Sequence, residues 1–231
     1  MSAVLVVVAH PDDEVLGCGG TMARLAQEGR SVHLLVLADG VGARHVDGHT
    51  DARVMDEQRR RRAALTAASQ VLGVQSVDTA DFPDNRMDTV AVLDVARRVE
   101  QSIAAHRPTM VLTHHAGDVN QDHRRTHEAV IAACRPQPGH PVDTLLFFEV
   151  ASSTEWQVPG AAPVFQPSWF VDTSSTITKQ LEALSCYAEE LRPWPHPRSA
   201  EALRARAAWR GATVGVEAAE AFMLGRRLVR G

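Results

Sequence analysis

Short runs of branched apolar residues alternate along the chain with longer segments in which apolar residues recur every three or four positions. The short runs are typical of strands buried on both faces, and the periodic segments are typical of helices with one apolar face. Strands are predicted at 4–8, 32–37, 74–79, 109–113 and 144–150. Helices are predicted from the acids at 12–14, at about 53–72, 89–106, 178–191 and 200–210, and from 122. This alternation favours a doubly wound α/β fold, with a mostly parallel sheet and helices on both faces.

Single residues mark the ends of some of these helices. Gly73 is predicted to end the second helix, Ser199 to cap the helix that follows it, and Gly211 to end that helix. From Glu217 the chain returns to apolar residues, which predict either a final helix or a strand. The polar segment 41–51 is predicted to be a loop of the kind that often carries function.

Chemical groups gather where the first strand ends. The strand is followed by His10-Pro11 and then by Asp12, Asp13 and Glu14, where the first helix begins. Sites in open α/β sheets are built at such junctions. Acids there can simply cap the helix and suit its dipole, but this does not account for the histidine before them. His10 and Asp13 offer donors that suit Zn²⁺, with Asp12 beside the metal and not bound to it.

A second cluster follows the fourth strand, with four histidines and two aspartates within residues 114–127. If Asp122 is an N-cap, His123 begins a helix and His127 lies one turn later on the same face. In one interpretation His123 alone completes a site with His10 and Asp13. In another, His123 and His127 chelate a metal together. A third interpretation is that these histidines only form hydrogen bonds within a polar loop, and His114 is expected to end the strand as part of the structure.

The length of 231 residues and an apolar fraction of 45% fit one large domain, whose part from about residue 150 supplies substrate-binding loops. A net charge of −4 gives no reason to expect nucleic acid or an anionic membrane as a partner. Three separated cysteines without a CxxC pair predict a reduced, cytoplasmic setting. The first apolar run is too short for a signal peptide or a membrane span. The sequence leaves a homo-oligomer open.

The part after residue 144 contains residues suited to substrate binding. Glu149 ends the fifth strand, and Trp156 and Trp194 are candidate platforms for a sugar ring, although tryptophan is more often part of a core. A proline-rich loop at 192–199 would present His196 and Arg198 with little loss of entropy. On the second helix, the four arginines at 59–62 most simply form a solvated face, although one could point back over the site.

Two motifs, AHPDDE at 9–14 and DVNQDH at 118–123, resemble the PIG-L/LmbE-like family of zinc-dependent N-acetylglucosaminyl deacetylases. Later segments resemble further blocks of that family, namely FEVASSTEW at 148–156, PHPRS at 195–199 and the stretch 210–222. The resemblance implies a Rossmann-like fold and Zn²⁺ bound by His10, Asp13 and His123. It also implies that Asp12 is the general base for a water that attacks the acetyl carbonyl.

One position departs from the family pattern. Many relatives have a histidine where this chain has Asn120, and that histidine helps to stabilise the oxyanion or to protonate the amine. Asn120 can steady an oxyanion but has no titratable proton. The candidates for the acid are His115, Asp118 and His196, unless Asp12 returns its own proton to the amine. We expect His196 to act, because the stiff loop holds it and Arg198 beside it could grip the substrate.

The expected function is therefore a zinc-dependent hydrolase that removes acetyl from a small-molecule N-acetylated amino-sugar conjugate. Its expected catalytic residues are Asp12, Asn120 and His196, and its expected substrate contacts are Arg198, Trp156, Glu149, Asp118 and His115. A zinc amidase acting on a non-sugar amide is an alternative. A non-catalytic nucleotide-binding domain is another, although the glycines at 17, 19 and 20 do not form GxGxxG.

Overall fold

A computed structural model describes residues 2–42 and 52–229, so the predicted loop at 41–51 falls almost entirely outside the described residues. Within them one sheet of seven strands runs in the order β3-β2-β1-β4-β5-β7-β6. The strands are β1 (Ala3–Val8), β2 (Ser31–Ala38), β3 (Ser76–Phe82), β4 (Met110–His114), β5 (Thr144–Phe148), β6 (Trp169–Asp172) and β7 (Ala219–Arg227). The helices are α1 (Asp13–Gln27), α2 (Ala52–Leu72), α3 (Val92–His106), α4 (Gln121–Ala133), α5 (Ile177–Cys186) and α6 (Ala200–Ala212).

The sheet is mostly parallel, which confirms the predicted fold class. Strands β1 to β5 pair in parallel, and only β7 runs antiparallel to its neighbours β5 and β6. The strand order reverses between β1 and β4, because β2 and β3 lie on one side of β1 and β4 and β5 on the other. In open α/β sheets the loops at the carboxyl ends of two such strands diverge and leave room for a ligand. A ligand site is therefore expected at the carboxyl ends of β1 and β4.

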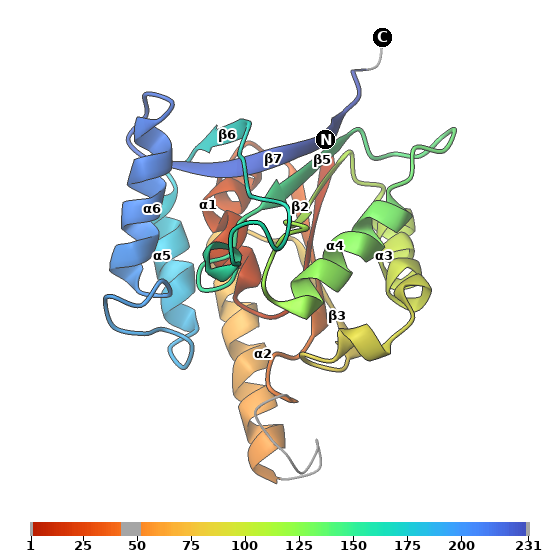
Figure 1. The fold of residues 1–231 in the computed structure, drawn as a ribbon, viewed down its shortest axis with the longest axis horizontal. Helices are drawn as coiled ribbons and strands as arrows, with labels where there is room; N and C mark the ends of the chain where they lie inside the picture. The colour runs from red at the N-terminus through yellow and green to blue at the C-terminus, as the bar shows by residue number, and fades with distance from the viewer. Residues whose placement is uncertain (1, 43–51, 230–231) are drawn as a thin grey trace.

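Helices cover both faces of the sheet, and each face has its own apolar core. Figure 1 shows α5 and α6 on one side of the sheet and α3 and α4 on the other. Apolar residues of α1, α2, α5 and α6 pack on one face, and those of α3 and α4 on the other. The strand residues between them alternate from one core to the other, as the pleat requires. Within the described ranges, no helix combines the length and the apolar character needed to cross a bilayer.

Several element ends differ from the sequence-based prediction. The strand β6 was not predicted, because its four residues are too few to show a period and it forms only by pairing with β7. The segment from Glu217 contains strand β7, and α5 ends at Cys186, five residues before its expected end. Gly211 lies inside α6, close against the backbone of Val216 and Ala218, and does not end the helix. Ser199 does cap α6, since its hydroxyl accepts from the Ala202 N–H at 3.0 Å.

Helix α1 is interrupted near its middle, at Cys18, whose φ of −152° is not helical. A break in a helix frees backbone donors and acceptors, which must find other partners when they are buried. The carboxylate of Glu220 on β7 accepts from the N–H groups of Gly20 and Thr21 at 2.9 and 2.7 Å. The amide of Gln180 on α5 donates to the Val15 carbonyl at 2.8 Å. Residues far along the chain therefore stabilise the helix that begins at the acids 12–14.

This arrangement predicts that Glu220→Gln destabilises the protein. An amide can accept from one of the two N–H groups but turns its own N–H toward the other, which leaves a buried donor unsatisfied. We expect a loss of about 1–3 kcal/mol in the free energy of unfolding, measured by urea denaturation. The control is Glu217→Gln at an exposed position of the same region, expected to change stability by less than about 0.5 kcal/mol. Equal stabilities for the two variants would contradict this role of Glu220.

Candidate active site

Three predicted metal ligands lie together at the point where the strand order reverses. His10 follows β1, Asp13 begins α1, and His123 lies in the first turn of α4, and all three are buried. The Asp13 Oδ2 atom is 3.4 Å from His10 Nδ1 and 3.3 Å from His123 Nε2. One donor atom from each residue lies within 4.8 Å of the others. Two imidazole nitrogens and one carboxylate oxygen are the donors of many catalytic zinc sites, which keep a fourth position open.

His127 points away from this group, although it lies one turn after His123 on α4. Its Nδ1 atom is 2.9 Å from the His114 carbonyl oxygen, and its ring lies against Phe147 with the centroids 4.5 Å apart. Among the described residues, no group of candidate metal donors includes His127. The arrangement of donors thus corresponds to the interpretation in which His123 joins His10 and Asp13 without His127.

Each histidine of the group also contacts a buried aspartate through its second ring nitrogen. His123 Nδ1 is 3.1 Å from Asp118 Oδ2, and His10 Nε2 is 3.1 Å from Asp122 Oδ2. Such contacts fix the tautomer and the orientation of a metal-binding imidazole. His10 also forms a second candidate group with Asp84 and Asp122. The Asp122 oxygens there already accept from the N–H groups of residues 85 and 87, at 2.6 and 3.0 Å. We therefore regard Asp122 as the partner of His10 and not as a ligand.

The prediction that Asp122 caps the helix was wrong. The N-cap of α4 is Asn120, whose Oδ1 accepts from the Asp122 N–H at 2.8 Å. The Asp122 side chain is free to reach His10 because it lies inside the helix, one residue before His123. Asn120, expected near the oxyanion, thus has its carbonyl oxygen engaged in capping. Its Nδ2 atom lies 3.4 Å from the Asn85 side chain.

Asp118 is fully buried beside His123 and forms no exposed surface of the site. Its carboxylate accepts from the Thr154 hydroxyl at 2.8 Å, from the Asn120 N–H at 2.9 Å and from the Ser153 hydroxyl. Burial alone would raise the pKa of Asp118, but the contact with His123 and these donors lower it to about 2. The ionised Asp118 carboxylate orients the His123 ring. The sequence suggested that Asp118 contacts the substrate, but because it is buried it could act on the substrate only through His123.

The region carries more buried acid than base, which favours a bound cation. Seven acidic side chains are buried here, namely Asp12, Asp13, Glu14, Asp84, Asp118, Asp122 and Glu190. Burial opposes a charge on His123, yet Asp13 and Asp118 outweigh it and raise the pKa of His123 to about 9. The pKa of His10 is raised as well, against the effect of burial, by Asp122, Asp13 and Asp84. The surroundings thus demand positive charge at the two imidazoles, and a divalent metal between them would satisfy that demand.

Asp12 lies next to the metal-donor group in a backbone conformation that few residues adopt. Its φ is 106°, and its side chain makes no cap to α1. A residue other than glycine is strained at such an angle, so the surrounding structure must hold it there. The Asp12 N–H donates to the Glu14 carboxylate at 3.0 Å, and that carboxylate accepts from the Tyr187 hydroxyl at 2.6 Å. Burial raises the pKa of Glu14 to about 7, although the hydrogen bond from Tyr187 partly opposes this increase.

Two arginines from segments far apart in the sequence bind the Asp12 side chain. Its Oδ2 atom lies 3.4 Å from Arg61 on α2 and 3.2 Å from Arg198 in the proline-rich loop. Both guanidinium groups also bind Glu190, and Arg61 donates to the Pro11 carbonyl at 2.6 Å. Arg61 is therefore the one arginine of the 59–62 run that turns back over the site. The other three are at least half exposed.

The remaining predicted residues lie around this centre at different depths. His196 accepts from the Arg198 N–H at its Nδ1 atom, at 3.0 Å, and its ring meets the exposed Trp156 edge-on with the centroids 5.9 Å apart. Trp156 and Trp194 are exposed and not part of a core. Arg198 also donates to the Ser152 hydroxyl at 2.6 Å.

Glu149 and His115 face another part of the molecule. Glu149 forms a two-pronged ion pair with Arg210, and His115 contacts the Pro163 carbonyl at 2.8 Å. Both belong to a neighbouring hollow and not to the metal-donor group.

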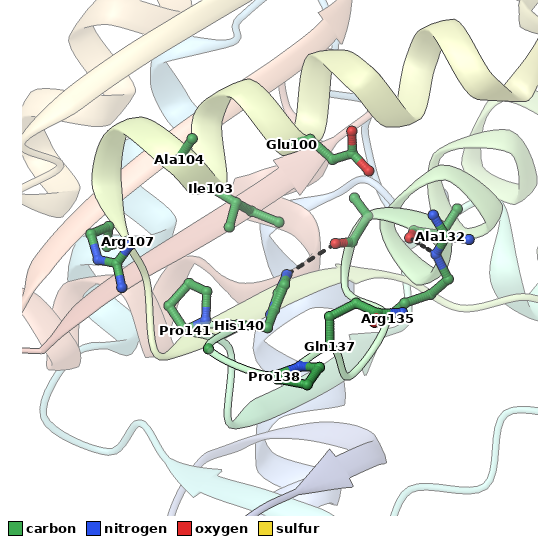
Figure 2. Close-up of a pocket in the computed structure, with 12 residues that line it drawn as sticks. Glu100, Ile103, Ala104, Arg107, Ala132, Arg135, Gln137, Pro138, His140 and Pro141 are labelled. Atoms are coloured by element: carbon green, nitrogen blue, oxygen red, sulfur yellow. Dashed lines mark hydrogen bonds between the residues drawn. The ribbon is translucent and has the colours of Figure 1, made fainter.

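A larger hollow of about 390 Å³ lies at the other end of the strands from the metal-donor group, between the last turns of α3 and α4 and the loop 135–141. The His140 Nε2 atom lies 3.1 Å from the Ala133 carbonyl oxygen, and Arg135 donates to the Ala132 carbonyl at 2.9 Å. Figure 2 shows the His140 and Arg135 side chains among the residues that line this hollow. These groups satisfy carbonyls at the end of α4, which is a structural task. Because it holds none of the metal donors, this hollow is not the active site despite its size.

The sequence of this chain is similar to one protein family and to several known proteins. A family model described as GlcNAc-PI de-N-acetylase matches residues 5–134, which is more than half of the chain. Uncharacterized deacetylase YaiS of Escherichia coli (strain K12) is 32% identical over 140 residues, covering 58% of this chain and 69% of that protein. Diacetylchitobiose deacetylase of Thermococcus kodakarensis is 28% identical over 198 residues, covering 81% and 69%. The 4-oxalmesaconate hydratase of Pseudomonas putida is 29% identical over 208 residues, covering 84% and 76%.

Solved structures resemble the whole of this chain. A conserved protein of Thermus thermophilus superposes with a TM-score of 0.75 at 27% identity, covering 100% of this chain and 98% of its own. The 4-carboxy-2-hydroxymuconate hydratase of Pseudomonas putida superposes with a TM-score of 0.79 at 22% identity, covering 100% and 99%. The second likeness shows a shared fold only, because its sequence identity is low.

The two candidate helix ligands can be separated by metal analysis. We expect His123→Ala to lose zinc, because it removes one of three clustered donors, and His127→Ala to retain about one zinc per chain. Zinc content measured by mass spectrometry after dialysis distinguishes the two variants. Loss of zinc from the His127 variant with retention in the His123 variant would overturn the ligand set.

Metal affinity is expected to fall as the pH is lowered. In the metal-free protein the pKa of His123, about 9, keeps its ring protonated at neutral pH, and a metal must displace that proton. Each displaced proton makes the apparent affinity for zinc rise about tenfold per pH unit below that pKa. Chelator competition between about pH 6 and 8 measures this slope. Asp118→Asn removes one cause of the raised pKa and should flatten the slope, so equal slopes for the two proteins would contradict the explanation.

Proposed function

The chain belongs to the GlcNAc-PI de-N-acetylase family, PIG-L, and on that premise we propose that it removes the acetyl group from an N-acetylated amino sugar by hydrolysis. The observation that carries the proposal is the position of Asp12. This carboxylate is adjacent in sequence to Asp13 but outside the metal-donor group, and it is buried and held by two arginines. Metal-assisted amide hydrolysis uses a metal-binding group with a separate base beside it, and this arrangement offers both.

His10, Asp13 and His123 would hold the metal, and their mixed nitrogen and oxygen donors fit Zn²⁺. When bound there, zinc would supply a Lewis acid that polarises the acetyl carbonyl and makes a water molecule more acidic. Asp118 and Asp122 would keep the two imidazoles oriented through their second nitrogens. The histidine protons that the metal-free site retains would be lost when the metal binds.

Asp12 would take the proton from the attacking water. Burial raises the pKa of its carboxyl group, and Arg61 and Arg198 oppose this increase, so that the pKa ends above its ordinary value. A carboxylate with a raised pKa accepts a proton from water more readily than an ordinary one. The strained backbone, tied to Glu14 and through it to Tyr187, keeps the carboxylate from relaxing into a helix cap.

His196 is our candidate for the acid that protonates the departing amine. To act as the acid its ring must first be protonated on both nitrogens, and Nδ1 would then have to release the Arg198 backbone N–H that it accepts in this structure. The same loop contributes Arg198, which contacts Asp12. One short segment therefore carries both the candidate acid and an arginine that binds the base. Trp156 at the edge of the His196 ring offers an exposed aromatic face to a sugar. Asn120 keeps only its amide N–H groups for an oxyanion, because its oxygen caps α4.

The part of the chain from about residue 150 thus supplies the substrate-contacting loops of what we take to be one domain. The family model ends at residue 134, before Trp156, His196 and Arg198. These residues would determine which conjugate is accepted, while the shared part would hold the metal. The ligand chemistry fits a small N-acetylated amino-sugar conjugate as the partner.

A hydratase is the second candidate, because one relative of that kind matches 84% of the chain. Water addition would use the same metal-donor group and base. The 4-carboxy-2-hydroxymuconate named for the structural neighbour has several acidic groups. In this chain Arg61 and Arg198 are already paired with Asp12 and Glu190, and the surrounding buried side chains are largely acidic. This charge distribution favours a neutral amide over a polyanion.

The proposal is tested by measuring acetate released from N-acetylglucosaminyl compounds with the zinc-loaded protein and Asp12→Asn. We expect the variant to retain zinc and to lose activity by about a hundredfold or more, because the base is lost while the ligands remain. The control is Asp81→Asn, which alters an exposed carboxylate and should keep full activity. Near-normal turnover by the Asp12 variant would refute its role as base, and water addition to an unsaturated diacid without acetate release would favour the hydratase.

A further inference from the structure

A hollow of about 280 Å³ lies beside the proposed active site and has no assigned role. Its walls come from the loop after β4, from the end of β5, from residues 154–165 and from Arg210 on α6. Apart from the loop after β4, these segments follow residue 134, where the family match ends. The hollow is therefore built mainly by the part of the chain that the family model does not describe.

The hollow lies at the same end of the parallel strands as the metal-donor group, at their carboxyl ends. It is lined by Thr154, whose hydroxyl binds Asp118, and Asp118 in turn contacts His123. Strand β1, which leads to His10, and strand β5, which leads to Glu149, are separated only by β4. Two strand spacings correspond to about 10 Å. A group attached to a sugar whose acetamide lies at His123 would extend over this distance toward the hollow.

The lining combines a polar pair with an apolar wall. Glu149 accepts from two nitrogens of Arg210 at 2.9 and 2.7 Å, and both side chains remain about a fifth exposed. The Arg210 guanidinium lies over the Phe165 ring, 5.6 Å from its centroid, and Val158 and Val164 continue the apolar side. A carboxylate and a guanidinium with unused hydrogen-bonding positions, facing an aromatic wall, suit the hydroxyl groups and the apolar face of a sugar ring.

The charges of the lining argue against an acidic ligand. The lining contains two acidic side chains, Glu149 and Glu155, one guanidinium, that of Arg210, and the His115 ring, whose Nε2 atom is engaged with the Pro163 carbonyl at 2.8 Å. Arg210 is already paired with Glu149, so an added anion would meet the negative charge of Glu155 with no free cation to offset it. Unpaired like charges lower affinity and serve to reject a partner.

We propose that this hollow is the subsite for the group attached to the N-acetylated sugar, and that it takes a neutral sugar in preference to an acidic group. The inference rests on the proposed function for the reacting end of the substrate. Its own content is the role of Glu149, Arg210, Phe165 and Val158 in selecting the other end.

The test fills the hollow without touching the metal-donor group. Val158→Trp places a large side chain at an exposed lining position, and Val229→Trp makes the same change at an exposed position outside the hollow. For Val158→Trp we expect the KM for N,N′-diacetylchitobiose to rise about tenfold or more, with kcat/KM for N-acetylglucosamine unchanged. Val229→Trp should match the unmodified protein on both. Equal losses on the two substrates, or no loss on the disaccharide, would overturn the subsite.

Charge selection and binding are measured separately. The unmodified protein should favour the neutral disaccharide over N-acetylglucosamine linked to malate by about tenfold or more in kcat/KM, and the reverse order would overturn the neutral-sugar assignment. Calorimetric titration with the disaccharide separates the subsite from the proposed reaction. Binding that Val158→Trp weakens, without acetate release, would support the subsite and refute the deacetylase proposal. Absence of binding to the unmodified protein would refute the subsite.

Discussion

The site depends on the concentration of buried carboxylates at the point where the strand order reverses. Seven acids are buried in this region, and charge of this kind is tolerated only when cations or donors face it. His10 and His123 have raised pKa values because they provide part of that positive charge. A metal ion would replace their protons, so the electrostatics of the fold and the capacity to bind a metal have one physical origin.

The proposed base requires support from the whole length of the chain. Asp12 has a backbone angle that strains any residue other than glycine, so the surrounding structure must hold it there. Arg61 comes from α2, Tyr187 from the end of α5 and Arg198 from the proline-rich loop. The break in α1, stabilised by Glu220, ties the same helix to β7, the next-to-last strand of the sheet. The rigidity of the site is thus a property of the assembled fold.

The groups described at the site and in the hollow beside it come from two regions of the chain. The metal-donor group lies within the 5–134 match to the family, whereas Tyr187, Arg198 and the hollow with Arg210 lie mainly after it. Solved structures named as a deacetylase and as a hydratase share this fold. A common metal and base would serve any reaction that activates water, and the later segments would choose the substrate. The difference between such relatives is therefore expected in the loops around β5 and in α6.

The sequence by itself determined the features that depend on neighbouring residues. The alternating apolar runs predicted the parallel sheet, and His10 and Asp13 were recognisable as candidate donors where a strand ends and a helix begins. The position of His123 left two metal-binding interpretations open, and the family resemblance implied the set of three. Only the tertiary structure decided which of four arginines turns inward, and that Asn120 caps α4 while Asp122 contacts His10. It also decided that Asp118 holds His123 and that β6 exists. These outcomes depend on contacts between segments far apart in sequence, and local periodicity carries no information about such contacts.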